Sequence, residues 1–205
     1  MADIIGSGDL EPKRTMQEFR QIVQCINEQS KYLLSPLTIT LGDEFQGVCH
    51  TISDGLATII AIEELILKSQ CSFRLRYVLF NGLIETPVNT VSAYEMLGEG
   101  LTSARSHLQN LKKTDDRFFI FLGGANDLQE TRINAAFGVM QYLIGQWHSK
   151  DYKAVAAFLE YGDYKQVAEV LGVDPSTAWR RKRSLGINAY LQMKSIILAW
   201  TKLTE

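Results

Sequence analysis

The spacing of apolar residues switches several times between a strand period and a helix period, which predicts an α+β arrangement that ends in helices alone. Residues 37–41 and 73–79 alternate between apolar and polar positions, as half-buried strands do. After Pro12, apolar residues recur on one face of a helix. The predicted elements are strands at residues 2–5, 37–41, 44–49, 73–79 and 118–122, and helices at residues 12–26, 53–69, 101–112, 128–147, 175–184 and 188–204.

The order of these elements predicts the fold class. A β-α-β-β-α-β series followed by α-β is typical of the split βαβ arrangement of ferredoxin-like folds, and the chain then becomes wholly helical. We therefore expect an α+β protein with a ferredoxin-like (βαββαβ) domain at residues 1–125, a connecting helix at 126–149 and an all-α domain at 150–205.

Composition and length narrow the class of protein. The 205 residues are 46% apolar and 21% charged, which excludes a disordered tail, a fibre and a small disulfide-bonded scaffold. No apolar run approaches the roughly 20 residues of a membrane helix, and no signal peptide opens the sequence, so we expect a cytoplasmic protein. Cys25, Cys49 and Cys71 lack metal-binding spacing and are expected to be reduced thiols.

Charge is unevenly distributed between the two predicted parts. Residues 150–205 carry nine basic and six acidic side chains, a net charge of +3, which leaves −5 for the rest of a chain whose total is −2. Four of the basic residues, 180–183, are consecutive. A basic tail on an acidic body predicts that the tail meets an anionic partner.

Two acidic residues are expected at one end of the sheet. In a split βαβ unit, strands one and two are parallel with strand three between them, so the hairpin after strand two lies at the end where strand one exits. Asp3 is at that exit and Asp43 is in that hairpin. Carboxylates placed together in this way suit Mg²⁺ or Mn²⁺, although a lone Asp in a hairpin is usually just a turn residue and an Asp after a strand is often only a cap or turn former.

Glycines beside these acids predict a phosphate site. Gly6, Ser7 and Gly8 open the connection to the first helix, where backbone N–H groups can approach a phosphate without a Cβ in the way. Two metal ions held by Asp3 and Asp43 would activate a nucleotide hydroxyl and stabilise charge on the departing pyrophosphate.

Four segments resemble motifs of nucleotide-cyclising enzymes. Ala2 to Ser7 resembles the first-strand metal motif of class III nucleotidyl cyclases, and Leu41 to Phe45 resembles both their hairpin motif and the GGDEF signature of diguanylate cyclases. The segments 74–82 and 94–98 are similar to a strand and a base-contacting segment of the cyclases. This resemblance implies a palm domain that binds a purine nucleotide, with Gly42, Glu95 and Gly98 beside it.

The chain also departs from the cyclase pattern. Thr102 stands where the cyclases place an Asn, and Arg105 is one residue short of their Arg position, an offset of about 100° around a helix. Glu44 and Arg105 are weak candidates for catalytic residues, so no catalytic residue is assigned. The pattern favours binding of a nucleotide over fast turnover.

The whole chain resembles the bacterial SatD family. The string ITLGDEFQG at residues 39–47 carries the most specific part of this resemblance, and Ala104 and Arg105 in a helix with a helical tail add to it. The resemblance implies a cyclase-like domain followed by a DNA-binding-like tail.

Residues 164–184 resemble a helix-turn-helix. Gly172 permits the turn, Asp174 is suited to cap the next helix, and Pro175 suits its first position. The candidate DNA contacts on that helix are Ser176, Thr177, Arg180, Arg181 and Arg183. The alternative is a packing module whose arginines form a solvated face. Trp179 is expected to anchor the core of the module.

The last predicted helix, 188–204, has a broad apolar face that serves either for packing within the chain or as a homodimer seam. Only two residues precede Asp3 in a strand that should be central. We expect a few upstream apolar residues, a tag remnant, or a genuinely short strand.

Three functions remain open at this point. The first is a regulator in which a nucleotide-binding domain acts on a DNA-binding tail. The second is an active nucleotidyl cyclase or nucleotidyltransferase whose tail mediates dimerisation. The third is a scaffold or DNA-binding protein without ligand function in the palm.

Overall fold

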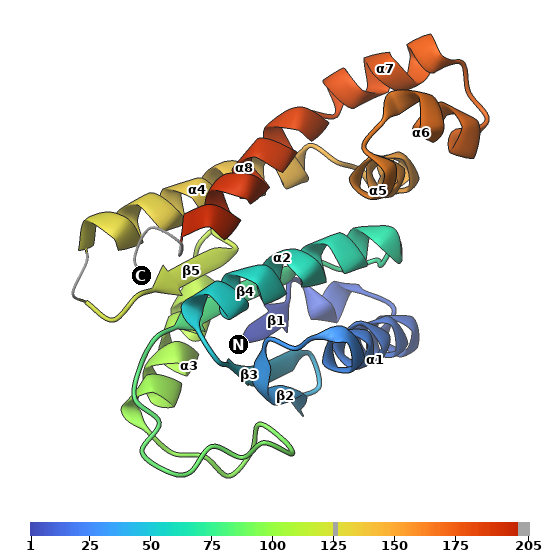
Figure 1. Cartoon of the computed structure of the whole chain (residues 1–205). Coiled ribbons are helices and arrows are strands. Elements are labelled where there is room, and N and C mark those ends of the chain that lie inside the picture. The colour runs from blue at the N-terminus through green and yellow to red at the C-terminus, as the bar shows by residue number, and fades with distance from the viewer. Residues whose placement is uncertain (125–126, 201–205) are drawn as a thin grey trace.

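The computed structural model describes residues 1–124 and 127–200 (Figure 1). They form an α+β structure with one five-stranded mixed sheet. The elements are β1 (Ala2–Ile4), the 3₁₀ turn η1 (Ser7–Asp9), α1 (Pro12–Gln29), β2 (Leu33–Leu41), β3 (Glu44–Cys49), α2 (Ile52–Lys68), β4 (Leu75–Phe80), α3 (Glu99–Leu111), β5 (Phe118–Phe121), α4 (Asp127–Gly145), the 3₁₀ turn η2 (Ser149–Asp151), α5 (Tyr152–Tyr161), α6 (Tyr164–Leu171), α7 (Pro175–Ser184) and α8 (Ile187–Ala199).

The strands lie in the order β2-β3-β1-β4-β5. β3 is antiparallel to both β2 and β1, β1 is antiparallel to β4, and β4 is parallel to β5. Strand β1 is therefore central, although it is only three residues long. Its Ala2 pairs with Phe45 of β3 on one side and with Tyr77 of β4 on the other.

Helices cover both faces of the sheet. The alternate residues Ala2 and Ile4 of β1 belong to the large core that also contains the buried faces of α1, α2 and α4. Val78 of β4 faces the other way and packs with Ala104 and Leu108 of α3 in a smaller core. Because side chains alternate across a strand, Met1 and Asp3 lie on the α3 face of the sheet.

The helical tail packs against the sheet-containing part of the chain. α8 contacts α4 and α2, and α5 contacts α2. Trp147 is fully buried and its indole N–H donates to the Leu185 carbonyl at 2.7 Å. Lys194 forms an ion pair with Glu64 at 2.6 Å. α6 and α7 project away from the sheet at the upper right of Figure 1.

The predicted elements match the observed ones closely, and α7 has the predicted bounds. β2 begins earlier than predicted, at Leu33, because the chain is already extended there and pairs with Cys49 despite irregular register. The apolar face of α8 packs inside the chain, with Tyr190 and Ile197 fully buried. The end of the predicted helix 188–204, residue 125 of the predicted ferredoxin-like domain and residue 126 of the predicted connecting helix lie outside the described residues. In the described ranges no helix has the length and apolarity required to cross a membrane.

Candidate functional site

The sheet topology brings Asp3 and Asp43 to the same end of the sheet. Asp3 pairs with Glu44 in the β1–β3 register, and the Ile4 N–H donates to the Asp43 carbonyl at 2.9 Å. The hairpin that holds Asp43 therefore lies directly against the exit of β1. This juxtaposition follows from β3 lying between β1 and β2.

The Asp3 carboxylate is held by two cations and is 2% exposed. Its Oδ2 is 3.0 Å from the Lys112 ammonium and 3.5 Å from the Arg76 guanidinium. Its Oδ1 is buried and has no hydrogen-bond partner among residues 1–124 and 127–200. Burial raises the pKa of Asp3, the two cations oppose that effect, and nearby Asp43 adds to it.

Asp43 is tied to the loop that follows β1. Its Oδ2 accepts a hydrogen bond of 2.6 Å from the Ser7 hydroxyl. Two glycines in left-handed conformations allow these turns: Gly6 with φ +63° before η1, and Gly42 with φ +27° in the hairpin. Gly8 lies within η1 and is exposed. The predicted phosphate loop and the predicted metal ligand are thus in direct contact.

Glu44 and Arg105 also meet at this end. Arg105 Nη2 lies 3.3 Å from Glu44 Oε1, and Glu44 is 2% exposed. We call the assembly of six charged side chains the charged edge. Its members are the carboxylates Asp3, Asp43 and Glu44 and the cations Arg76, Arg105 and Lys112.

The charged edge fits a metal ion only in one form. Among the described residues there is no group of three or more acidic, histidine or cysteine side chains arranged to hold a metal ion by themselves. Mg²⁺ is commonly bound through one or two carboxylates together with the phosphates of a substrate. Asp3 and Asp43 would supply the two carboxylates of such a donor set, with the buried Asp3 Oδ1 free of a partner in the described part of the chain, and the cations beside them would attract phosphate.

Two members of the charged edge, Arg76 and Lys112, were not among the site residues predicted from the sequence. Arg76 lies within the alternating segment of β4, where its register opposite Asp3 depends on how β1 pairs. Lys112 is the C-cap residue of α3. Neither has a local motif, and only the packing of α3 across the sheet places Lys112 near Asp3.

Glu95 and Gly98 lie in a different environment from Asp3. Gly98 is the N-cap of α3 and Lys112 is its C-cap, so the two residues are roughly 20 Å apart along the helix axis. Glu95 is exposed with φ +59°, a backbone strain for a residue other than glycine. The Tyr94 hydroxyl donates to the Ile39 carbonyl at 2.8 Å, which docks this segment on β2.

The α6–turn–α7 segment has the local chemistry that was predicted. Gly172 adopts φ +64° at the end of α6. The Asp174 carboxylate accepts a hydrogen bond from the Ser176 N–H at 2.8 Å and caps α7, whose first residue is Pro175. Ala178 is fully buried and fixes the inner face of α7.

The predicted DNA contacts lie on the outer face of α7. Arg180, Arg181 and Arg183 are exposed, as is Ser176, whereas Thr177 is half-buried. The prediction that Trp179 anchors the core is wrong, because its side chain is 44% exposed. Arg183 instead stacks its guanidinium 4.9 Å from the centre of the Trp179 ring.

Comparison with known proteins gives one family. The SatD family model matches residues 1–199. No curated protein and no solved structure matches the chain.

Proposed function

Because the chain belongs to the SatD family, we propose on the basis of its geometry that it is a DNA-binding regulator that responds to a nucleotide. α7 would contact DNA, and the charged edge would bind a nucleotide with Mg²⁺ or Mn²⁺. The observation that carries the proposal is the capped, exposed α7 with three arginines on its outer face.

The DNA-binding half of the proposal rests on shape and charge together. α6 and α7 are joined by a short turn as in a helix-turn-helix, and α7 would be the recognition helix. Arginine guanidinium groups bind phosphates and guanine edges through two parallel hydrogen bonds. The ion pairs of the chain do not include Arg180, Arg181 or Arg183 within the described residues. Their charge is therefore available to a ligand.

The DNA contact is tested by charge reversal. We expect R180E with R181E to weaken binding to a labelled mixed-sequence duplex by more than about tenfold at low salt, and to reduce the salt slope by about two. The matched control is K13E with R20E, which makes the same charge change on exposed positions of α1. Equal affinity of the two double variants, measured by fluorescence anisotropy, would remove α7 from the proposal.

The nucleotide half of the proposal rests on the charged edge. The strand order β2-β3-β1-β4 supports a ferredoxin-like palm, in which Asp3 and Asp43 come together. When bound, the metal ion would neutralise phosphate charge. Asp3 and Asp43 would hold it, while Arg76 and Lys112 would turn from Asp3 toward phosphate oxygens.

Thermal unfolding tests this half. We expect ATP or GTP with Mn²⁺ to raise the Tm of the parent chain, and Asp43→Asn to abolish the increase, because a ligand that binds only the folded state stabilises it. Glu28→Gln, on the exposed side of α1, is the control and should keep the increase. Absence of any increase with either nucleotide would reduce the proposal to DNA binding alone.

A hydrogen-bonded path connects the two proposed sites. The Ile5 N–H donates to the Arg74 carbonyl at 2.9 Å, and the Arg74 side chain donates to the Trp147 carbonyl at 3.0 Å. The Trp147 indole then donates to Leu185, the residue that directly follows α7. This path supports coupling between the loop beside Asp43 and the DNA-binding helix.

Coupling is tested by removing one link. We expect Trp147→Phe to leave both ligands bound but to abolish any effect of nucleotide on DNA affinity. Trp200→Phe is the control, because the buried Trp200 indole N–H has no hydrogen-bond partner in the part of the chain that the structure describes. If Trp147→Phe retains the full effect of nucleotide, the coupling does not run through this link.

An active nucleotidyl cyclase is the second candidate. Arg105 lies over Glu44 at the charged edge, which favours it, whereas the Thr102 hydroxyl is bonded back to Gly98 within its own helix at 3.4 Å. Release of pyrophosphate from ATP or GTP, lost in Asp43→Asn, would establish the enzyme. Nucleotide binding without pyrophosphate release would favour the regulator.

A further inference from the structure

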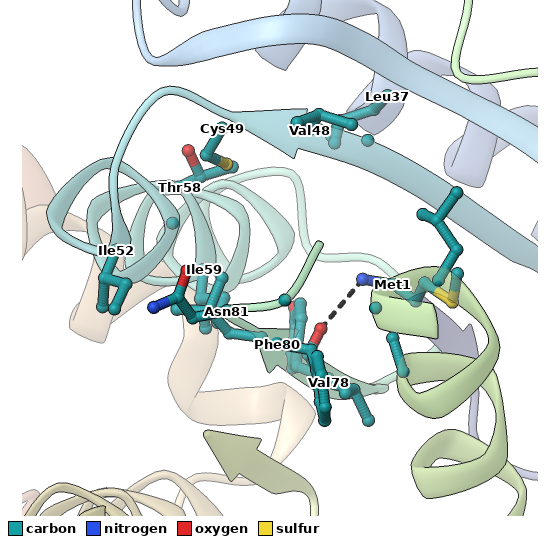
Figure 2. A pocket seen from close by; sticks show the side chains of 18 of the residues that line it. Met1, Leu37, Val48, Cys49, Ile52, Thr58, Ile59, Val78, Phe80 and Asn81 are labelled. Atoms are coloured by element: carbon teal, nitrogen blue, oxygen red, sulfur yellow. Dashed lines mark hydrogen bonds between the residues drawn. The ribbon is translucent and has the colours of Figure 1, made fainter. Parts of the chain in front are cut away.

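Trp179 is the tryptophan that the fold leaves uncovered. Trp147 is fully buried and Trp200 is half-buried, whereas Trp179 is 44% exposed. Figure 2 shows the contrasting case in the body of the protein: Ile59 of α2 and Val78 of β4 line a cavity of about 200 Å³, and both are buried. Trp179 lies instead on the surface of α7, among arginines. Packing within the described residues therefore does not account for so large a side chain at this position.

The exposed face of α7 holds Trp179 together with polar and basic side chains. Ala178 is fully buried and marks the inner side of the helix. At about 100° per residue, Ser176, Arg180 and Arg183 lie within roughly 40° of the outward direction, and Trp179 lies at their flank. All four side chains are exposed. A ligand that covers the arginines would therefore also reach the indole ring.

The Trp179 ring also holds the Arg183 side chain in place. The guanidinium carbon of Arg183 lies 4.9 Å from the centre of the ring, from one helical turn away. A guanidinium that stacks on a ring uses its flat face, so the N–H groups at its edge stay available for a second partner. Arg180 differs, because it donates to the Ser176 carbonyl and the Thr177 hydroxyl of its own helix at 3.3 and 3.4 Å.

The major groove of DNA offers a partner for each of these two groups. The C5-methyl group of thymine is an apolar feature of the groove, and guanine presents O6 and N7, which a guanidinium binds through two hydrogen bonds. Base pairs are stacked about 3.4 Å apart. An indole and a guanidinium 4.9 Å apart therefore reach neighbouring base pairs rather than distant ones.

We propose that Trp179 and Arg183 together recognise a thymine next to a guanine on one DNA strand, with the indole against the thymine methyl and the guanidinium on guanine O6 and N7. This inference rests on the proposed DNA contact of α7 and makes that contact sequence-specific. Trp179 has two roles in it: it contacts the methyl group, and it positions Arg183 at the guanine. Arg180 and Arg181 contact phosphates, which carry no sequence information.

Three duplexes of about 20 base pairs, roughly two turns of DNA, separate the two contacts. The first pairs an alternating thymine–guanine strand with its complement. The second has uracil for thymine and lacks only the methyl groups, and the third has 7-deazaguanine for guanine and lacks only N7. We expect the parent chain to bind the first about fourfold more tightly than the second, the value of one buried methyl group, and at least about fivefold more tightly than the third. Fluorescence anisotropy measures the affinities.

Substitutions in α7 assign each preference to its side chain. Trp179→Ala should remove the preference for thymine over uracil and weaken the preference for guanine, because Arg183 loses its stacking partner. Trp179→Phe should keep most of both preferences. Arg183→Lys should keep the thymine preference and lose the guanine preference, because an ammonium group cannot make two parallel hydrogen bonds. Tyr142→Ala removes an exposed aromatic side chain from α4 and is the control, which should leave both preferences unchanged.

Three results would overturn this inference and leave the DNA contact of α7 in place. The first is equal affinity of the parent chain for the thymine and uracil duplexes. The second is an unchanged thymine preference in Trp179→Ala. The third is tighter binding of the single thymine–guanine strand than of its duplex, lost in Trp179→Ala, because Trp179 would then be a stacking platform for unpaired bases. Failure of the parent chain to bind any of the duplexes would contradict the proposed function as well.

Discussion

Two carboxylates of this protein, Glu63 and Asp3, are almost equally buried, at 4% and 2% exposed, but they are neutralised in different ways. Glu63 accepts hydrogen bonds from the Tyr77 hydroxyl at 2.7 Å and from Arg117 at 2.6 Å. The Arg117 side chain is itself 7% exposed and also donates to the Leu75 carbonyl. The partners of Glu63 thus come from the core.

The partners of Asp3 come from the edge of the molecule. The Lys112 side chain is 33% exposed and the Arg76 side chain is 16% exposed. Among the described residues Asp3 Oδ1 has no hydrogen-bond partner, and Arg117 Nη1 beside Glu63 has none either. The Glu63–Arg117 pair is therefore closed, meaning that both partners are buried, whereas the cations that pair with the buried Asp3 are partly exposed.

The largest expected effect is on the closed pair. Arg117→Met should lower the free energy of unfolding by about 3–5 kcal/mol, because it leaves the Glu63 charge buried without its ion partner. Urea denaturation measures the loss, and Arg132→Met, at an exposed position of α4, is the control. A loss below about 1 kcal/mol would show that stability depends no more on the ion partner of Glu63 than on an ion partner of Asp3.

A smaller loss is expected at the charged edge. Lys112→Met should cost about 1–2 kcal/mol, because Asp3 keeps Arg76 and water can enter from the surface. Lys113→Met is the matched control, since Lys113 directly follows Lys112 and is exposed. The double variant D3N/K112M should recover most of the loss. A loss as large as that of Arg117→Met would show that the partly exposed Lys112 stabilises the protein as much as the buried Arg117 does.

The pH dependence of stability gives a subtler comparison. Burial raises the pKa of Asp3 above 3.8, so the folded state binds the proton more tightly than the unfolded state does. Asp3 therefore lowers stability as the pH rises from below 3.8 through its folded pKa. The effect is limited because Lys112 and Arg76 oppose it.

We expect the free energy of unfolding of Asp3→Asn, relative to that of the parent chain, to increase across that rise in pH. Urea denaturation at a series of pH values measures it. Asp116→Asn reports the effect of removing an exposed carboxyl group. A relative stability of Asp3→Asn that falls as the pH rises would mean that the cations outweigh burial at Asp3.

The smallest expected effect is at Arg105. Its side chain is 47% exposed, so Arg105→Met should change the free energy of unfolding by only about 0.5 kcal/mol, as water replaces the guanidinium beside Glu44. A loss comparable to that of Arg117→Met would place Glu44 with the closed carboxylate Glu63. The same urea series measures it.

Local sequence chemistry predicted the tail well. Gly172, Asp174 and Pro175 act within one turn of chain, so the end of α6 and the start of α7 could be read without knowing the rest of the molecule. The exposure of Trp179 could not be predicted from local sequence, because a helix face becomes buried only when another helix covers it. Here Ala178 faces the core and its neighbour Trp179 does not.

At the sheet, the order of strands was enough to predict that Asp3 and Asp43 share one end. It was not enough to predict what they touch. Lys112 is 109 positions from Asp3 in the chain, and the contact depends on the length of α3 and on its course back across the sheet. The roles of Glu95 and Gly98 at the nucleotide remain predictions, at the far end of that same helix.

The amino-acid sequence by itself determined the α+β class, the bounds of most helices and strands, and the end of the sheet where the acids gather, since these follow from periodicity, capping and strand order. Tertiary structure decided the pairing of Asp3 with Lys112 and Arg76 and the outward position of Trp179. Each of these depends on which distant segments meet, and short-range preferences do not encode that.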